Sequence, residues 1–351
     1  MTETEKMTTT GEEAVLLFRR MVAGSSLPSE YGRRAVKLHL DGALEEARLN
    51  YERVLACDPS NFYALNNLGH LLLTRGEYEE AAAFFRKVIG VEPAYPLAYN
   101  NLGNALLSLG RVEEARAEYR RAIALDRNYA MPHRNLALVN RLLGRAGAAV
   151  AEYRMYFRLK PAEAKDADAH FNMGVLLEEA GEAEEAAREY ERALADDPRH
   201  AKALNNLGLL RFTRRDVEGA IELYRRALEA DEGFALARYN LGLALAARGE
   251  HALAAAEFER VVELAPDNVQ AESNLGVLYT TTGRYEEAVS IFERLVASDP
   301  AQPTLRLNLA LAYQGKGLAE QADAELREVV RLEPQGSPRA ERARRAMSAA
   351  G

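Results

Sequence analysis

Small and large apolar residues follow one another in a pattern that recurs about every 34 residues along the chain. A glycine or alanine recurs in register at Ala35, Gly69, Gly103, Ala137, Gly174, Gly208, Gly242, Gly276 and Ala310. An alanine follows each of these after 12 residues, and a large apolar residue comes four positions later, from Ala47 and Tyr51 to Ala322 and Leu326. A spacing of four places two side chains on one face of an α-helix. The pattern therefore predicts a repeated helical unit.

Helix-breaking residues divide each of these units. A glycine lies between the two small residues at Gly42, Gly76, Gly110, Gly144, Gly181, Gly249, Gly283 and Gly317. Proline ends most units, at Pro59, Pro93, Pro161, Pro198, Pro266, Pro300 and Pro334. Glycine readily ends a helix in the left-handed conformation, and proline cannot continue one. Each unit is therefore predicted to be a helix, a turn, a second helix and a breaker. Because neither helix can bury its apolar face alone, we expect the units to stack into an all-α solenoid.

These residues resemble the tetratricopeptide repeat (TPR) family, which has Leu-Gly, alanine, an aromatic residue and proline in the same order. Asn67-Leu68-Gly69 and Asn206-Leu207-Gly208 are close matches, and the resemblance covers residues 28–336. It implies a right-handed superhelical solenoid of tandem helix-turn-helix repeats, in which the first helix of each repeat lines a concave groove. The nine expected repeats are 28–61, 62–95, 96–129, 130–163, 167–200, 201–234, 235–268, 269–302 and 303–336.

The two ends differ from the repeats. We predict a disordered tail at residues 1–10, a capping half-repeat at residues 11–27 and a capping helix at residues 337–351. Terminal units of a solenoid need a polar outer face, since no further unit covers them.

Four positions depart from the repeated pattern. Arg127 and Glu232 replace the terminal proline, Arg215 replaces the turn glycine, and Arg211 stands where the core favours an apolar side chain. The step between Ala137 and Gly174 is 37 residues, with the three extra residues within 162–169. We expect a local change of superhelix pitch there.

Composition narrows the possible functions. A net charge of −8 argues against a nucleic-acid partner, because phosphate contacts need a basic surface. The single cysteine, Cys57, rules out a framework of intramolecular disulfides. The first residues do not resemble a secretory signal, and no run of about 18 apolar residues is present, so we expect no membrane insertion and a cytoplasmic location. The preference for arginine over lysine favours a bacterial source.

The sequence shows neither a catalytic nor a metal-binding pattern. The six histidines are scattered, and none forms an i, i+4 pair with another histidine or with the cysteine. His133 and His170 occupy equivalent positions of successive repeats, where packing is the simpler interpretation. The sequence contains no phosphate-binding loop and no nucleophile elbow. We therefore predict a protein without enzymatic activity and without a cofactor.

An asparagine stands two residues before the small residue of almost every first helix. The series is Asn67, Asn101, Asn135, Asn172, Asn206, Asn240, Asn274 and Asn308. A side-chain amide both donates to and accepts from a peptide backbone. The series is similar to the asparagine ladder in the repeat domains of O-linked N-acetylglucosamine transferases, and this resemblance implies a clamp for extended polypeptide. The alternative is that these amides bond to neighbouring helices.

An apolar stripe is expected directly after the small residue. From the fourth repeat onward this position holds Leu138, Val175, Leu209, Leu243, Val277 and Leu311, whereas the second and third repeats have His70 and Asn104. Three aromatic residues are predicted on the same face, Phe171, Phe212 and Tyr239. An exposed apolar stripe is typical of a binding surface. The alternative is burial between adjacent first helices.

The leading hypothesis is a scaffold or adaptor that binds a polypeptide segment of a partner protein in its groove. Arg134, Asn172 and Lys202 approximate three positions of the carboxylate clamp that some TPR proteins use, but Leu138 and Asn206 replace the other two. Two alternatives stay open. One is a self-assembling scaffold, and the other is a substrate-recruiting subunit of a separately encoded transferase.

Overall fold

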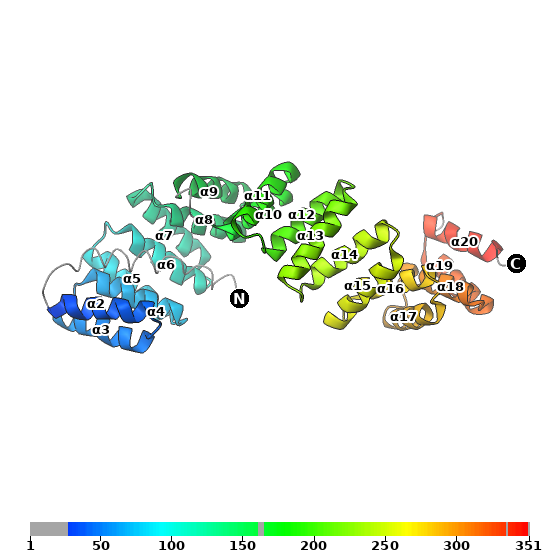
Figure 1. Cartoon of the computed structure of the whole chain (residues 1–351), viewed down its shortest axis with the longest axis horizontal. Helices are drawn as coiled ribbons and strands as arrows, with labels where there is room; N and C mark the ends of the chain where they lie inside the picture. Colours follow the sequence, from blue (N-terminus) through cyan, green and yellow to red (C-terminus); the bar gives the residue numbers. More distant parts are fainter. Residues whose placement is uncertain (1–26, 161–164, 335, 350–351) are drawn as a thin grey trace. The chain divides into compact units, whose positions relative to one another are not determined.

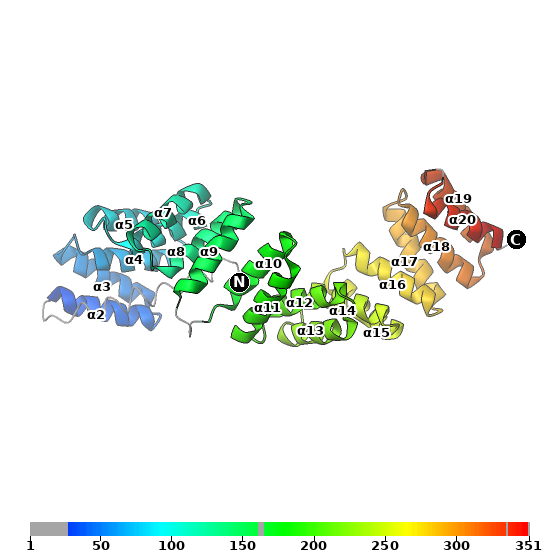
Figure 2. The same ribbon diagram turned by 90° about the horizontal axis from the view of Figure 1, so that it is seen from above.

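The computed structural model describes residues 27–160, 165–334 and 336–349, so the expected tail and nearly all of the capping half-repeat lie outside the described residues. Within the described ranges every regular element is an α-helix. The helices are α2 (Leu27–Leu40), α3 (Leu44–Cys57), α4 (Phe62–Thr74), α5 (Tyr78–Val91), α6 (Pro96–Ser108), α7 (Val112–Leu125), α8 (Ala130–Leu142), α9 (Ala146–Leu159), α10 (Ala167–Glu179), α11 (Ala183–Asp196), α12 (Ala201–Thr213), α13 (Val217–Ala230), α14 (Ala235–Ala247), α15 (His251–Leu264), α16 (Val269–Thr281), α17 (Tyr285–Ser298), α18 (Pro303–Lys316), α19 (Ala319–Leu332) and α20 (Pro338–Ala349) (Figures 1 and 2).

Adjacent helices pack in pairs because the small residue of the first helix meets the ring of the second. A Cβ atom added at Gly103 would lie 2.5 Å from the ring of Tyr119, and one added at Gly69 would lie 2.9 Å from the ring of Phe85. The rings at this position have at most 2% of their surface exposed, at Tyr51, Phe85, Tyr119, Tyr153, Tyr190, Tyr224, Phe258 and Phe292. The predicted all-α architecture of tandem helix-turn-helix repeats is confirmed.

The turn glycines end the first helices in the left-handed conformation. Gly76 has a φ of 80°, and its amide donates to the carbonyl of Leu73 while the amide of Glu77 donates to that of Leu72. These bonds satisfy carbonyls that the helix leaves open at its end. Arg215 keeps the same conformation without being glycine, with a φ of 69°.

The chain divides into two compact units, and the boundary between them in the sequence follows Glu182. In unit 1, one buried cluster runs from Ala35 on α2 to Val139 on α8. In unit 2, another runs from Ala220 on α13 to Ala312 on α18. Within each unit the second helix of one pair packs against the first helix of the next, as α5 does against α6 and α13 against α14. Each pair therefore depends on its neighbours for burial.

The last helix, α20, begins at a proline and lies against the final pair. Ala343 is buried together with Leu326 and Val329 of α19. The hydroxyl of Ser337 accepts a hydrogen bond of 3.1 Å from the amide of Ala340, which caps the helix.

Candidate functional site

The first helices of consecutive pairs are linked by the asparagine series. In unit 1, Asn67, Asn101 and Asn135 are at most 2% exposed. The amide of Asn101 donates to Oδ1 of Asn66 at 3.1 Å. Asn135 donates to Oδ1 of Asn100 and to Oδ1 of Asn104, both at 3.0 Å. These three amides are enclosed, and the bonds of Asn101 and Asn135 hold neighbouring first helices together.

The same series is more open in unit 2. Asn206, Asn274 and Asn308 are half-buried, as is Asn172 at the end of unit 1. Asn240 is 9% exposed and donates to Asn205 at 2.9 Å. Asn206 donates to the hydroxyl of Tyr190 at 3.2 Å, and Asn274 to that of Tyr239 at 3.1 Å.

Most bonds of the series therefore reach a side chain 35 residues earlier, as from Asn240 to Asn205. Sequence reasoning missed these acceptors. In the sequence, a second asparagine directly before a member of the asparagine series could have indicated them. These residues are Asn66, Asn100 and Asn205. The bonds show how the amides serve the stacking of helices, and a role in binding peptide stays a prediction.

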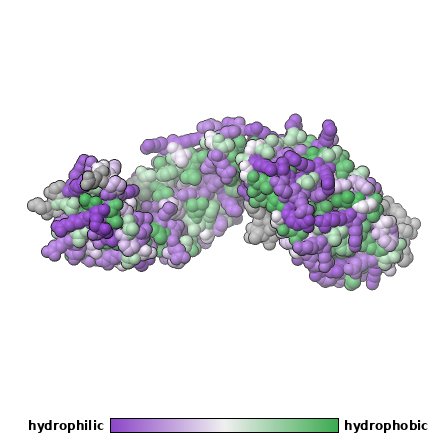
Figure 3. Space-filling view, turned by 180° about the vertical axis from the view of Figure 1, so that it is seen from behind, coloured by the Kyte–Doolittle hydropathy of each residue, from purple (hydrophilic) through white to green (hydrophobic). Residues whose placement is uncertain are grey.

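The predicted apolar stripe is partly accessible. Leu138, Val175, Leu209, Leu243 and Leu311 are half-buried, and Val277 is 40% exposed. Phe171 is also half-buried. Phe212, Tyr239 and Leu243 lie against the buried cluster of unit 2 while keeping part of their surface open. Figure 3 shows hydrophobic residues reaching the molecular surface in patches separated by hydrophilic side chains.

Two histidines lie close together where unit 1 has polar residues in place of the stripe. The rings of His39 on α2 and His70 on α4 have centroids 5.6 Å apart, and the hydroxyl of Tyr51 lies 3.4 Å from Nδ1 of His39. Both ring nitrogens of His70 are buried without a hydrogen-bond partner among the described residues. Burial, with the nearby ring of His39 as a smaller cause, lowers the pKa of His70 to about 4. His70 is thus neutral at physiological pH.

A half-buried ion pair involves Asp166, which lies within the range expected for the three extra residues. Asp166 caps α10 by accepting from the amide of Ala169, and its carboxylate binds Nε of Arg134 at 2.7 Å and the hydroxyl of Tyr156 at 2.7 Å. Burial opposes ionisation of Asp166, but the charge of Arg134 and these hydrogen bonds outweigh it, so the pKa of Asp166 lies below its ordinary value. Arg134 stands at one of the three positions that resemble a carboxylate clamp. Its guanidinium is therefore already paired with a carboxylate of its own chain.

The two histidines in equivalent positions of successive repeats do not form a common site. Nδ1 of His133 lies 2.6 Å from Glu152, while the ring of His170 stacks on Phe157 with centroids 3.8 Å apart. Among the described residues, no group of three or more His, Cys, Asp or Glu side chains is arranged to hold a metal ion. No helix in the described ranges is both long enough and apolar enough to cross a membrane.

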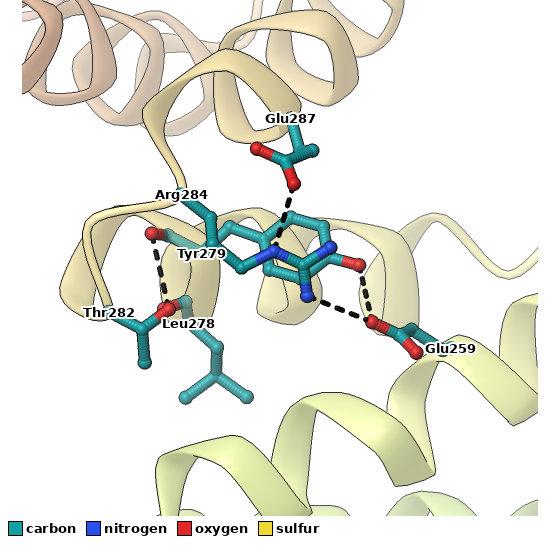
Figure 4. Close-up of polar contacts among 6 residues, drawn as sticks. All are labelled: Glu259, Leu278, Tyr279, Thr282, Arg284 and Glu287. Atoms are coloured by element: carbon teal, nitrogen blue, oxygen red, sulfur yellow. Dashed lines mark hydrogen bonds and ion pairs between the residues drawn. The ribbon is translucent and has the colours of Figure 1, made fainter.

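A polar cluster joins three helices at the turn between α16 and α17 (Figure 4). The guanidinium of Arg284 stacks on the ring of Tyr279 at 3.8 Å and bonds to Glu287 at 2.9 Å and to Glu259 at 3.3 Å. The hydroxyl of Tyr279 also donates to Glu259, at 2.6 Å. The charge of this turn arginine is thus balanced within the protein.

Models of one protein family match most of the chain. Those described as tetratricopeptide repeat or TPR repeat match residues 50–83, 69–110, 103–144, 171–235, 224–269, 239–303 and 279–347. Together the matches cover more than half of the sequence, and the chain belongs to the tetratricopeptide repeat family. No curated protein matches the chain at a significant level.

Solved structures with a similar fold include TPR proteins. The C-terminal part of a TPR repeat-containing protein from Cytophaga hutchinsonii is 18% identical, with 68% of this chain and 97% of that chain covered and a TM-score of 0.56. Pseudomonas aeruginosa pilF is 24% identical, with 66% and 99% covered and a TM-score of 0.50. YrrB, described as a TPR protein with an unusual peptide-binding site, is 22% identical, with 53% and 95% covered and a TM-score of 0.46. The fold and the family are those of protein-interaction scaffolds.

Proposed function

We propose that this protein is an adaptor that binds an apolar polypeptide segment of a partner protein on the first helices of unit 2. The binding surface, here called the apolar face, consists of Leu209, Phe212, Tyr239, Leu243, Val277 and Leu311. Each of these side chains keeps part of its surface open to solvent.

The absence of charge at equivalent positions of four helices carries this proposal. On α12, α14, α16 and α18, the first and fourth residues after the small residue are all partly or fully exposed. These positions hold Leu209, Phe212, Leu243, Ala246, Val277, Thr280, Leu311 and Gln314. In a chain with 28% charged residues, a partly exposed series without a charge is unusual for a surface that only meets water. This surface suits an uncharged or apolar segment, because binding would remove apolar surface from water without burying an unpaired charge.

The half-buried asparagines of unit 2 add polar contacts to this surface. Asn206, Asn274 and Asn308 belong to the same helices and lie two residues before the small residue. Each amide group has more hydrogen-bonding positions than the bonds described above use. In the proposed complex they bond to the backbone of the bound segment, while the enclosed Asn101 and Asn135 serve helix stacking.

Peptide selection tests the proposal directly. The full chain is immobilised, and a phage library of random 12-residue peptides is selected on wild type, on Val277→Glu and on Leu253→Glu. Leu253 is the matched control, since it is 53% exposed but lies on the second helix α15. We expect wild type and Leu253→Glu to enrich apolar peptides and Val277→Glu to lose at least about a hundredfold in affinity for them, because leaving a charge unpaired in a contact costs several kcal/mol.

The outcomes separate binding from stability. Both variants should melt like wild type, since both side chains are exposed. Equal binding by Val277→Glu and wild type would place the contact elsewhere and refute the proposed surface. Growth of the free chain into large oligomers, measured by light scattering over a range of concentrations, would instead favour the self-assembling scaffold.

A further inference from the structure

The turn between α12 and α13 has a backbone that its side chain does not favour. Among the described residues, Arg215 is the one residue other than glycine with a positive φ, at 69°. The equivalent turns use glycine, for example Gly249 with a φ of 84° and Gly283 with a φ of 82°. A side chain in the left-handed conformation is strained by its Cβ atom, and glycine would relieve this. The arginine is therefore not there for the stability of the turn.

Within the described ranges, the charge of Arg215 is also not paired. Its side chain is exposed and makes no ion pair with a described residue. Its neighbours are engaged, since Arg211 lies 3.6 Å from Asp216 and Arg214 lies 2.9 Å from Glu184. The local structure thus leaves one guanidinium unbalanced.

Comparison with the turn in Figure 4 shows that Arg215 is additional to the usual contacts. There, Tyr279 and Arg284 contact each other across the turn, and Gly283 lies between them in sequence. In the α12–α13 turn, Arg211 occupies the position of Tyr279 and Asp216 that of Arg284, so the contact across the turn is kept with other chemistry. Arg211 and Asp216 pair with each other, so the charge at the glycine position is additional to this contact.

This charge lies at the end of the helix that begins the apolar face. The backbone amide of Arg215 donates to the carbonyl of Phe212 at 3.0 Å. We propose that Arg215 binds an acidic side chain of the partner segment whose apolar residues lie on the apolar face, an inference that rests on the proposed function. A guanidinium stays protonated and binds a carboxylate through two parallel hydrogen bonds, so it suits this partner chemistry.

The same peptide library tests this inference with different variants. Arg215→Gly removes the charge and the strain, and Arg215→Lys keeps both. Arg248→Gln is the control, because it removes one charge from the next turn, where Arg248 is already paired with Glu250 at 2.7 Å. We expect peptides selected on wild type, Arg215→Lys and Arg248→Gln to carry Asp or Glu beside their apolar residues. Those selected on Arg215→Gly should lack this preference.

Fluorescence anisotropy then measures the affinity of each variant for one enriched peptide and for its analogue with Gln in place of the acidic residue. Arg215→Gly should weaken binding of the acidic peptide roughly two- to fivefold, the range of an exposed ion pair, and leave the Gln analogue unchanged. The loss should shrink at high salt, since exposed charges are screened. The melting temperature of Arg215→Gly should rise, which excludes unfolding as the cause.

The possible results distinguish this inference from the function on which it rests. Apolar peptides enriched without any acidic preference, or the same preference on Arg215→Gly as on wild type, would overturn the role of Arg215 and leave the apolar face intact. No enrichment on wild type would refute the proposed function and this inference with it.

Discussion

The position directly after the small residue has opposite surroundings in the second and third repeats, which belong to unit 1, and in the repeats of unit 2. In the second and third repeats it holds His70 and Asn104, which are polar yet only 4% and 2% exposed. In unit 2 it holds apolar residues that are more exposed, up to 40% at Val277. The same repeat position is therefore polar and closed in these two repeats of unit 1, and apolar and partly open in unit 2.

Hydrogen bonding between side chains accompanies the burial of Asn104. Oδ1 of Asn104 accepts from the hydroxyl of Tyr119 at 2.8 Å and from Asn135 at 3.0 Å. A buried amide with partners costs little, whereas one without partners costs about 1–3 kcal/mol. Leucine and valine offer no such bonds, so they add no polar links between the first helices of unit 2. Asn104 thus takes part in polar links between first helices of unit 1, and the partly open apolar residues of unit 2 belong to the proposed binding surface.

Acidification should affect unit 1 first. The pKa of His70 is about 4 in the folded protein against an ordinary 6.5. Between these values the unfolded chain binds a proton that the folded protein does not. The free energy of unfolding is therefore highest above pH 6.5, and it falls by about 1.4 kcal/mol per pH unit as the pH drops towards 4. Hydrogen exchange of α2–α4 at pH 7 and pH 5 measures this loss. His70→Leu should remove it, and equal pH dependence of wild type and variant would contradict the prediction.

Removal of an asparagine should have the next largest effect, and it should lower the free energy of unfolding more in unit 1 than in unit 2. Asn135→Ala leaves Oδ1 of Asn100 and of Asn104 with one bond fewer in a buried place, and we expect a loss of about 2–3 kcal/mol. Asn308 is the matched position in unit 2, where it is half-buried, and Asn308→Ala should cost less than about 0.5 kcal/mol. Thermal or urea unfolding compares the variants. Similar losses at both positions would mean that the asparagines have the same role in each unit.

The smallest effect is expected from added methyl groups at the helix contacts. A Cβ at Gly103 would lie 2.5 Å from the ring of Tyr119, but one at Gly242 would lie 3.0 Å from that of Phe258. Overpacking costs about 1–3 kcal/mol, while alanine in place of glycine returns up to about 1 kcal/mol of helix propensity. Gly103→Ala should therefore lower the free energy of unfolding by about 1–2 kcal/mol. Gly242→Ala should leave it near the wild-type value in the same unfolding experiment. A larger loss at Gly242 would show that unit 2 is the more tightly packed.

Much of the fold could be predicted from residue spacing because that spacing is local. The contact of Tyr119 with Gly103 joins two helices connected by a short turn, and the same contact recurs along the chain. The left-handed turn was likewise predictable from Gly76 and its equivalents, and Arg215 adopts the conformation that its position requires. The positions predicted for the apolar stripe are partly open, as at Val277, and their role in binding stays a prediction.

The sequence by itself determined the helices, their pairing and the positions that repeat. These follow from short spacings of residues within one helical hairpin. Only the tertiary structure decided which of two equivalent side chains is enclosed. Asn135 and Asn308 occupy the same slot, yet one is 1% exposed with two bonds and the other is half-buried. The reason is that the bonding partners of Asn135 lie on α6, 31 and 35 residues earlier, and the stacking of repeats brings them within reach.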